Sequence, residues 1–240
     1  MLDICWVTYP IHQCLRTNDT CGALHQLLDV ILVFSIDLQL PRCQRELQTH
    51  CGDTFDIINC RAALSFCGDT LQSPFELTGK SPYDMRTECI GEVRDTLCYP
   101  ATKQIANYLN LPSTRLTLGI DPLYPNISMP AATLYQSSTL HIAALLDRSV
   151  RVLIYAGTYD LVCNFVGNDR IARGLEWHGT QQFVEQPLRD WIVDGQPAGE
   201  TRAFGGLTFA TLRDAGHQAP YDRPVQALAL INRWLAGVPL

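Results

Sequence analysis

The stretch VLIYAGTYDLVCN, residues 152–164, contains an apolar run that stops at a glycine, with Asp160 three residues beyond that glycine. The unbroken apolar run is typical of a strand in a parallel sheet that is covered on both faces. We therefore predict a strand over residues 151–155 and a turn that carries Asp160 past its carboxyl end. In open α/β sheets, functional side chains gather at that edge of the sheet.

A second predicted strand, residues 207–212, leads into the loop RDAGHQAP, which contains His217 directly after a glycine. An acid after one strand and a histidine after the next is the order found in α/β-hydrolases, where a nucleophile precedes both. The carboxylate fixes the tautomer of the imidazole, and the imidazole moves a proton between the nucleophile and the leaving group. The alternative is structural: Asp160 closes an Asx turn or caps a helix, and His217 binds a loop carbonyl.

Helical patterns flank these strands, and the alternation predicts an α/β fold. The predicted helices cover residues 101–109, 116–120, 131–146, 164–175 and 224–235, with a short helical patch at 42–50. The apolar run 27–34 is consistent with either a buried strand or a helix. In the last helix, one face carries Val225, Leu228, Ile231 and Leu235. Asp222 stands where a cap would be, and Pro224 suits the first turn.

The composition is that of a globular protein, with 240 residues, 47% of them hydrophobic, and a formal net charge of -6. A chain of this length is long enough for one sizeable core. The acidic balance argues against a nucleic-acid partner, because no basic face is available. No apolar run is long enough to span a membrane. The sequence indicates no cofactor and no metal site.

Ten cysteines are many for a reducing compartment, and six of them lie between residues 43 and 98. No pair has C-x-x-C spacing, so a disulfide framework in an oxidising compartment fits better than a zinc site. Asn18 and Asn126 match the N-glycosylation pattern, which agrees with that compartment. The first residues lack the basic start and apolar stretch of a signal peptide, so we expect an incomplete N-terminus.

Several short blocks follow one another along the chain. They are LTGKSPYDMR at 77–86, LCYP at 97–100, NYLN at 107–110, YAGTYDLVCNFVGN at 155–168 and GHQAPYDRP at 216–224. Together they resemble the C-terminal portion of the serine carboxypeptidases, α/β-hydrolases that remove C-terminal residues from peptides. In that family the last two blocks run roughly YAGDxDxxCNxxGN and GHxxPxDxP. The likeness covers about residues 41–240.

The resemblance implies roles for individual residues. Asp160 matches the triad acid and His217 the triad base. Cys163 matches a family cysteine that forms no disulfide and lies near the substrate pocket, although a plain buried thiol is the commoner explanation. Gln218 and Thr158 depart from the family pattern, so they are expected near the site and could alter specificity. The spacing of the other cysteines resembles the bridges Cys43–Cys67, Cys51–Cys60 and Cys89–Cys98, whereas Cys5, Cys14 and Cys21 match no family cysteine.

The nucleophile of the family is missing from this sequence. It stands in a G-x-S-x-G elbow, and none of the nine serines here has glycines at that spacing. We therefore expect a truncated family member that folds poorly and is inactive alone. The resemblance implies that the full-length form acts on peptides with a free C-terminus, in the vacuole, the lysosome or the exterior.

We expect the chain to consist of three parts. Residues 1–40 are an unplaced segment outside the likeness, residues 41–100 a cysteine-rich insertion subdomain, and residues 101–240 the C-terminal part of the α/β-hydrolase domain. Two other interpretations stay open. One is a non-catalytic, secreted, disulfide-stapled binding protein derived from the family, which would need a true signal sequence. The other is a different α/β-hydrolase, such as an esterase or lyase, against which the cysteine framework and the LCYP block argue.

Overall fold

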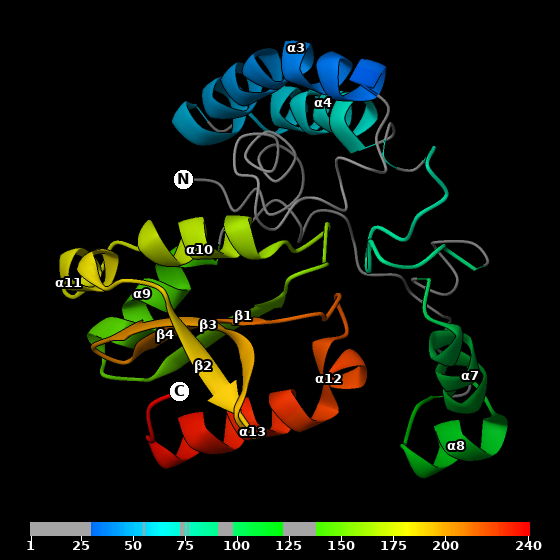
Figure 1. The fold of residues 1–240 in the computed structure, drawn as a ribbon. Helices are drawn as coiled ribbons and strands as arrows, with labels where there is room; N and C mark the ends of the chain where they lie inside the picture. Colours follow the sequence, from blue (N-terminus) through cyan, green and yellow to red (C-terminus); the bar gives the residue numbers. More distant parts are fainter. Residues whose placement is uncertain (1–29, 55, 73–74, 76, 91–97, 122–137) are drawn as a thin grey trace.

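A computed structural model describes residues 30–54, 56–72, 75, 77–90, 98–121 and 138–240 of the chain. Figure 1 shows a sheet with α9, α10 and α11 on one face and α13 on the other. A separate pair of helices, α3 and α4, lies at the top of the molecule in this view. The fold is therefore α/β with a disulfide-linked helical part, as the sequence predicts.

The sheet contains four strands among the described residues, in the order β1-β4-β3-β2. The parallel neighbours β1 (Val152–Gly157) and β4 (Leu207–Leu212) confirm the two predicted strands and their adjacency. The antiparallel strands β2 (Arg189–Val193) and β3 (Gln196–Phe204) were not predicted. The Asp194-Gly195 pair in the sequence is the signal that could have revealed them. A two-residue hairpin turn of this kind needs positive φ at both positions, and here φ is 51° at Asp194 and 75° at Gly195.

Helices cover both faces of β1. Val152 and Ile154 pack against a cluster built with α9 (Thr139–Asp147), α10 (Phe165–Arg173) and α11 (Thr180–Glu185). Leu153 packs on the other face, against the cluster that includes α13 (Pro224–Ala236). Successive residues of a strand point to opposite faces, so a strand covered on both sides needs an unbroken apolar run.

The final helix, α13, turns a different face to the core from the one that its sequence suggests. Ala227 and Leu230 are its buried residues. The four apolar residues of the predicted face are exposed by 37–62% of their surface: Val225, Leu228, Ile231 and Leu235. Pro224 occupies the first turn as predicted.

The prediction that Asp222 caps α13 was wrong. Arg223 holds the N-cap position, and no side chain caps the helix there. The Asp222 carboxylate instead accepts a hydrogen bond from the Gly216 amide at 2.7 Å, in the loop that carries His217. Asp222 also ends a single-turn helix, α12 (Ala219–Asp222), which was not predicted.

The remaining predicted helices agree with the structure in part. α7 (Pro100–Leu109) and α10 lie where they were expected, whereas α8 (Pro112–Thr117) ends before the predicted 116–120 segment does. α9 begins at Thr139, and residues 131–137 of the predicted helix lie outside the described residues. The helix α3 (Val30–Leu47) resolves the open choice for the apolar run in favour of a helix from Val30 onward, and it contains the start of the 42–50 patch.

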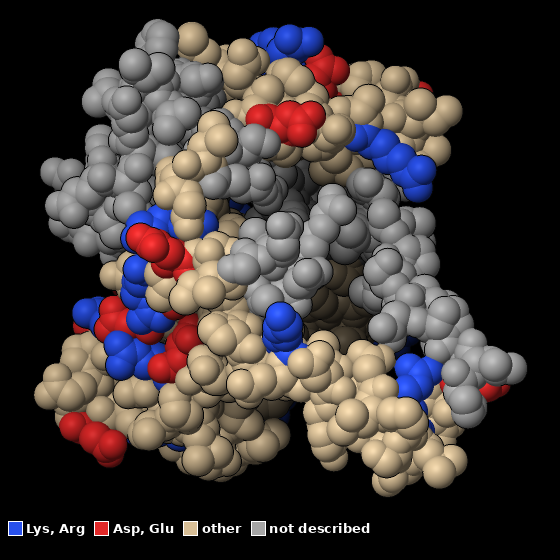
Figure 2. Space-filling view, turned by 90° about the vertical axis from the view of Figure 1, so that its right-hand side faces the viewer, with Lys and Arg blue, Asp and Glu red and all other residues tan. Residues whose placement is uncertain are grey.

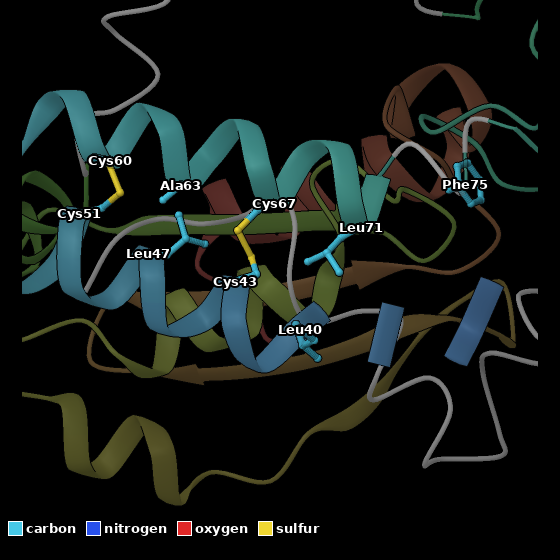
Figure 3. Packing of buried hydrophobic residues seen from close by; sticks show 9 residues of the cluster. All are labelled: Leu40, Cys43, Leu47, Cys51, Cys60, Ala63, Cys67, Leu71 and Phe75. Carbon is cyan, nitrogen blue, oxygen red and sulfur yellow. A yellow bond between two sulfur atoms is a disulfide. The ribbon is translucent and has the colours of Figure 1, made fainter. Parts of the chain in front are cut away.

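The cysteine-rich part forms a small core of its own. Disulfides join Cys43 to Cys67 and Cys51 to Cys60, which ties α3 and the short π-helix η1 (Gln48–Asp53) to α4 (Ile57–Cys67). Figure 3 shows both bridges between the two helices, with apolar side chains around them. A third disulfide joins Cys89 to Cys98. Because so few apolar side chains are buried here, the cross-links supply stability that a larger core would otherwise give.

The described surface carries charges of both signs. On the face shown in Figure 2, basic and acidic side chains are interspersed among the coloured residues. Within the described ranges, no helix has the length and apolar character needed to span a membrane. Cys5, Cys14, Cys21, Asn18 and Asn126 lie outside the described residues.

Candidate active site

The turn after β1 is held against the end of β4, and this brings Asp160 to the site. Amides at positions 158 and 159 donate to the carbonyls of Leu212 and Ala215, at 3.0 and 2.8 Å. The two loops approach so closely that a Cβ added to Gly157 would stand 2.3 Å from the Ala215 carbonyl oxygen. Only glycine fits between the loops at this point, which explains why the strand ends in Gly157.

Asp160 and His217 are 57 residues apart in sequence and are hydrogen-bonded in the structure. The His217 Nδ1 lies 2.8 Å from the Asp160 Oδ2. Asp160 is buried, with 3% of its surface exposed, whereas 35% of the His217 side chain is exposed. The second carboxylate oxygen of Asp160 accepts from the Cys163 amide at 3.0 Å. Asp160 therefore closes a local turn through the Cys163 amide, as the structural interpretation expects, and it also holds the His217 imidazole.

The surroundings of His217 favour its protonated form. The hydrogen bond with Asp160, followed by one with Cys163, raises the pKa of His217 from 6.5 to about 10, although burial acts in the opposite direction. The buried Asp160 carboxylate is thus the main group that favours the protonated imidazole. Such a pairing stabilises the imidazolium that forms when the base takes up a proton.

Cys163 lies beside the pair and is not in a disulfide. Its sulfur, a His217 ring nitrogen and an Asp160 oxygen lie within 4.8 Å of one another, close enough for a metal ion. The Asp160–His217 hydrogen bond accounts for this cluster without an ion, and we assign no metal to it. The Tyr83 ring also faces His217, with 5.2 Å between ring centroids.

The two residues that depart from the family pattern have contacts of their own. The Thr158 hydroxyl accepts from the Asp214 amide at 3.0 Å and so links the loop of the acid to the loop of the base. The Gln218 amide donates to the Tyr99 hydroxyl at 3.3 Å, and its side chain reaches the Thr102 hydroxyl at 3.5 Å. Gln218 thus lies next to the start of α7.

Sequence reasoning missed a charged network that surrounds the loop of His217. Arg86 binds the buried Asp84 carboxylate through two nitrogens, at 2.8 and 2.5 Å. The Tyr99 hydroxyl, whose pKa is raised by burial, lies 3.2 Å from the Asp222 carboxylate. These residues fall in the blocks at 77–86, 97–100 and 216–224, but no periodicity or spacing in the sequence pairs them.

A solved structure shows which fold this arrangement belongs to. The crystal structure of a prohormone-processing carboxypeptidase from Saccharomyces cerevisiae matches with a TM-score of 0.60 and 17% identity. The match covers 97% of this chain and 53% of that one. At this identity the likeness concerns the fold alone, and it places the chain among proteins with the α/β-hydrolase fold.

Sequence comparison then gives the family. The family model described as serine carboxypeptidase matches residues 17–237, and the chain belongs to that family. The match begins upstream of residue 41, inside the segment that the sequence left unplaced.

Several curated relatives are similar over most of this chain. Carboxypeptidase Y of Candida albicans is 34% identical over 206 residues, which is 82% of this chain and 37% of the relative. A serine carboxypeptidase-like protein of rice, Oryza sativa, is 35% identical over 207 residues, which is 82% of this chain and 46% of the relative. A vacuolar serine-type carboxypeptidase of Saccharomyces cerevisiae is 32% identical, over 90% of this chain and 44% of its own length. The chain thus spans less than half the length of these relatives.

Proposed function

We propose that this chain contributes the acid and the base of a serine carboxypeptidase, and that the complete enzyme acts on peptides with a free C-terminus. The observation that carries the proposal is the 2.8 Å hydrogen bond between the His217 ring and the buried Asp160 carboxylate. It lies past the carboxyl ends of two adjacent parallel strands, where α/β-hydrolases carry their acid and base. Asp160 fixes the imidazole through Nδ1, which leaves Nε2 to exchange a proton with a nucleophile.

The chemistry requires a nucleophile that these 240 residues do not offer in the expected form. None of the nine serines has the elbow spacing of the family. In our proposal the nucleophile, the oxyanion-stabilising amides and the groups that bind the substrate carboxylate come from sequence outside this chain. The 240-residue polypeptide alone is then inactive, because a base without its nucleophile and oxyanion site gives no acceleration.

Adding the missing part back tests this proposal. The purified chain and a fused protein are assayed on a blocked dipeptide; in the fusion, the chain follows the N-terminal part of Candida albicans carboxypeptidase Y. We expect no release of the C-terminal residue by the chain alone, and release by the fusion that an organophosphate inhibits. Organophosphate-sensitive hydrolysis by the 240-residue chain, or a folded fusion without activity, would contradict the proposal.

We assign the enzyme to the secretory route or the vacuole. Three disulfides lie within the described residues, and such bridges persist in oxidising compartments. The name of the Saccharomyces cerevisiae relative is that of a vacuolar enzyme. Asn18 and Asn126 are the proposed glycosylation sites. A mass shift on treatment with an endoglycosidase, lost in the Asn126→Gln variant, would locate one of them.

The second candidate is a non-catalytic binding protein with a serine carboxypeptidase ancestry. The missing elbow favours it, because a histidine and an acid without their nucleophile are not suited to catalysis in this polypeptide. The genomic DNA upstream of the first codon separates the two candidates. An in-frame elbow motif there favours the enzyme, whereas an in-frame signal sequence joined directly to this chain favours the binding protein.

A further inference from the structure

We propose that residues 81–87, here called the bracing segment, position the Asp160–His217 pair by binding both of the loops that carry it, and that Arg86 is its central positioning residue. The inference rests on the proposed function, because it concerns the same acid and base. The bracing segment comes from the cysteine-rich half of the chain, far in sequence from both loops. Among the described contacts, its side chains make no hydrogen bond to the Asp160 or His217 side chain. It holds the two loops through backbone bonds and through the Arg86 guanidinium, and the Tyr83 ring packs beside His217.

The first set of contacts holds the loop of the acid. Backbone amides of Leu161 and Val162 donate to the Pro82 carbonyl at 3.0 and 3.2 Å. In return, the Met85 amide donates to the Tyr159 carbonyl at 3.0 Å. These three bonds flank Asp160 on both sides, so the backbone at residue 160 is fixed relative to the bracing segment.

The second set holds the loop of the base. The His217 amide donates to the Tyr83 carbonyl at 2.7 Å, and Arg86 Nη1 donates to the Asp214 carbonyl at 2.5 Å. The packing is so tight that a Cβ on Gly216 would lie 2.4 Å from the Tyr83 carbonyl oxygen. A glycine before the histidine is therefore required by the close approach of the bracing segment, since Gly216 does not have a positive φ.

Arg86 is the residue that contacts both loops. Its guanidinium lies 5.1 Å above the centre of the Tyr159 ring, on the side of the acid, while Nη1 reaches Asp214 on the side of the base. Two further nitrogens bind Asp84, whose surface is 4% exposed. A planar guanidinium suits this fork, whereas a lysine has one charged nitrogen and would lose most of these bonds together.

The bracing segment is itself rigid. The buried Ser81 hydroxyl accepts from the amides of Tyr83 and Asp84 at 3.2 and 3.1 Å. The ends of the segment are joined by the bond from the Ser81 amide to the Thr87 carbonyl at 2.9 Å. A loop closed in this way has few conformations available, so its contacts hold the loops of the acid and the base in place.

The test measures the titration of His217 in the 240-residue chain by NMR of histidine labelled with ¹³C and ¹⁵N in the ring. His217 faces Asp160, Cys163 and Tyr83, and its pKa reports how well the carboxylate is placed. In Arg86→Met we expect the acid dissociation constant of His217 to rise at least tenfold, so that the pKa moves from about 10 toward 6.5. Gly216→Ala should do the same by separating the bracing segment from the loop of the base.

Matched controls make the result specific. Arg148→Met removes an exposed arginine whose guanidinium binds only its own helix among the described contacts, and Gly68→Ala adds a Cβ that meets no atom within 4 Å. Neither should move the titration of His217. If Arg86→Met does not fold, as judged by amide dispersion, Arg86→Lys and Gly216→Ala decide the matter.

Two outcomes separate the bracing role from the proposed function. If Asp160→Asn lowers the pKa of His217 but Arg86→Met, Arg86→Lys and Gly216→Ala leave it unchanged, the pair exists and the bracing segment does not position it. If Asp160→Asn also leaves the pKa unchanged, the pair itself is wrong and the proposed function fails with it.

Discussion

At the scale of single residues, Asp160 divides its two carboxylate oxygens between the Cys163 amide and the His217 ring. The sequence could predict that Asp160 and His217 meet, because both follow the ends of neighbouring strands. It could not predict the partners of Asp222 and Gln218. Those side chains bind Gly216, Tyr99 and Thr102, and such contacts depend on how distant segments fold together.

The raised pKa of His217 makes the stability of the fold depend on pH. His217 has a pKa of 6.5 in an unfolded chain and about 10 in the folded one, so the folded state binds the proton more tightly. The pair therefore stabilises fully below about pH 6.5, and its contribution is lost as pH rises to about 10. We expect the difference in melting temperature between the wild type and His217→Gln to shrink over this window. A difference that stays constant or grows with pH would contradict this, and His141→Gln is the control.

A substitution at Gly157 tests how closely the loop after β1 must approach the loop after β4. An added Cβ would meet backbone atoms at 2.3 Å, and the backbone cannot yield as a flexible side chain would. We expect Gly157→Ala to lower the free energy of unfolding in urea by about 1–3 kcal/mol, as overpacking does. Gly68→Ala, which meets nothing within 4 Å, should not lower it. Equal stability of the two variants would show that the loops after β1 and β4 do not pack so closely in solution.

At the scale of elements, an apolar pattern predicts that a helix is amphipathic but not always which face is buried. β1 and β4 could be predicted because a strand that is covered on both faces needs an unbroken apolar run. β2 and β3 have mixed sequences such as QPAGETRAF, in which Pro197 and Gly199 obscure the alternation. For α13, the small residue Ala227 and Leu230 face the sheet, and larger apolar residues remain outside.

Substitutions on the two faces of α13 measure this difference directly. Leu230 is fully buried, whereas Leu228 is 62% exposed. We expect Leu230→Ala to cost about 2–5 kcal/mol of unfolding free energy, because it leaves a cavity. Leu228→Ala should change it by no more than about 0.5 kcal/mol. If Leu228→Ala is the more damaging of the two, the face originally suggested by the sequence is the buried one.

At the scale of the whole molecule, two apolar features lack a cover among the described residues. β1 pairs only with β4 there, although helices cover both of its faces, so one edge of a parallel strand is open. The apolar face of α13 is close by, since Arg151 at the start of β1 donates to the carbonyls of Trp234 and Leu235 at 2.6 and 3.1 Å. Open edges and apolar faces promote association between chains.

We therefore expect the purified chain to self-associate. Sedimentation velocity should show species larger than a monomer that increase with concentration, and Leu228→Lys combined with Leu235→Lys should reduce them. The matched control is Arg148→Met, which leaves both apolar features intact. A chain that stays monomeric at every concentration and unfolds in one cooperative transition would show that these surfaces do not drive association.

In the proposed function, Asp160 and His217 are the acid and base of a serine carboxypeptidase, and kcat/KM of the fused protein with each residue replaced measures those roles. Asp160→Asn and His217→Ala should each lower it by about 10,000-fold, because the imidazole loses its orientation or is absent. His141→Ala, which alters an exposed histidine on α9, should stay near the wild-type value. If Asp160→Asn or His217→Ala keeps kcat/KM within about tenfold of the wild type, the pair is not the catalytic acid and base.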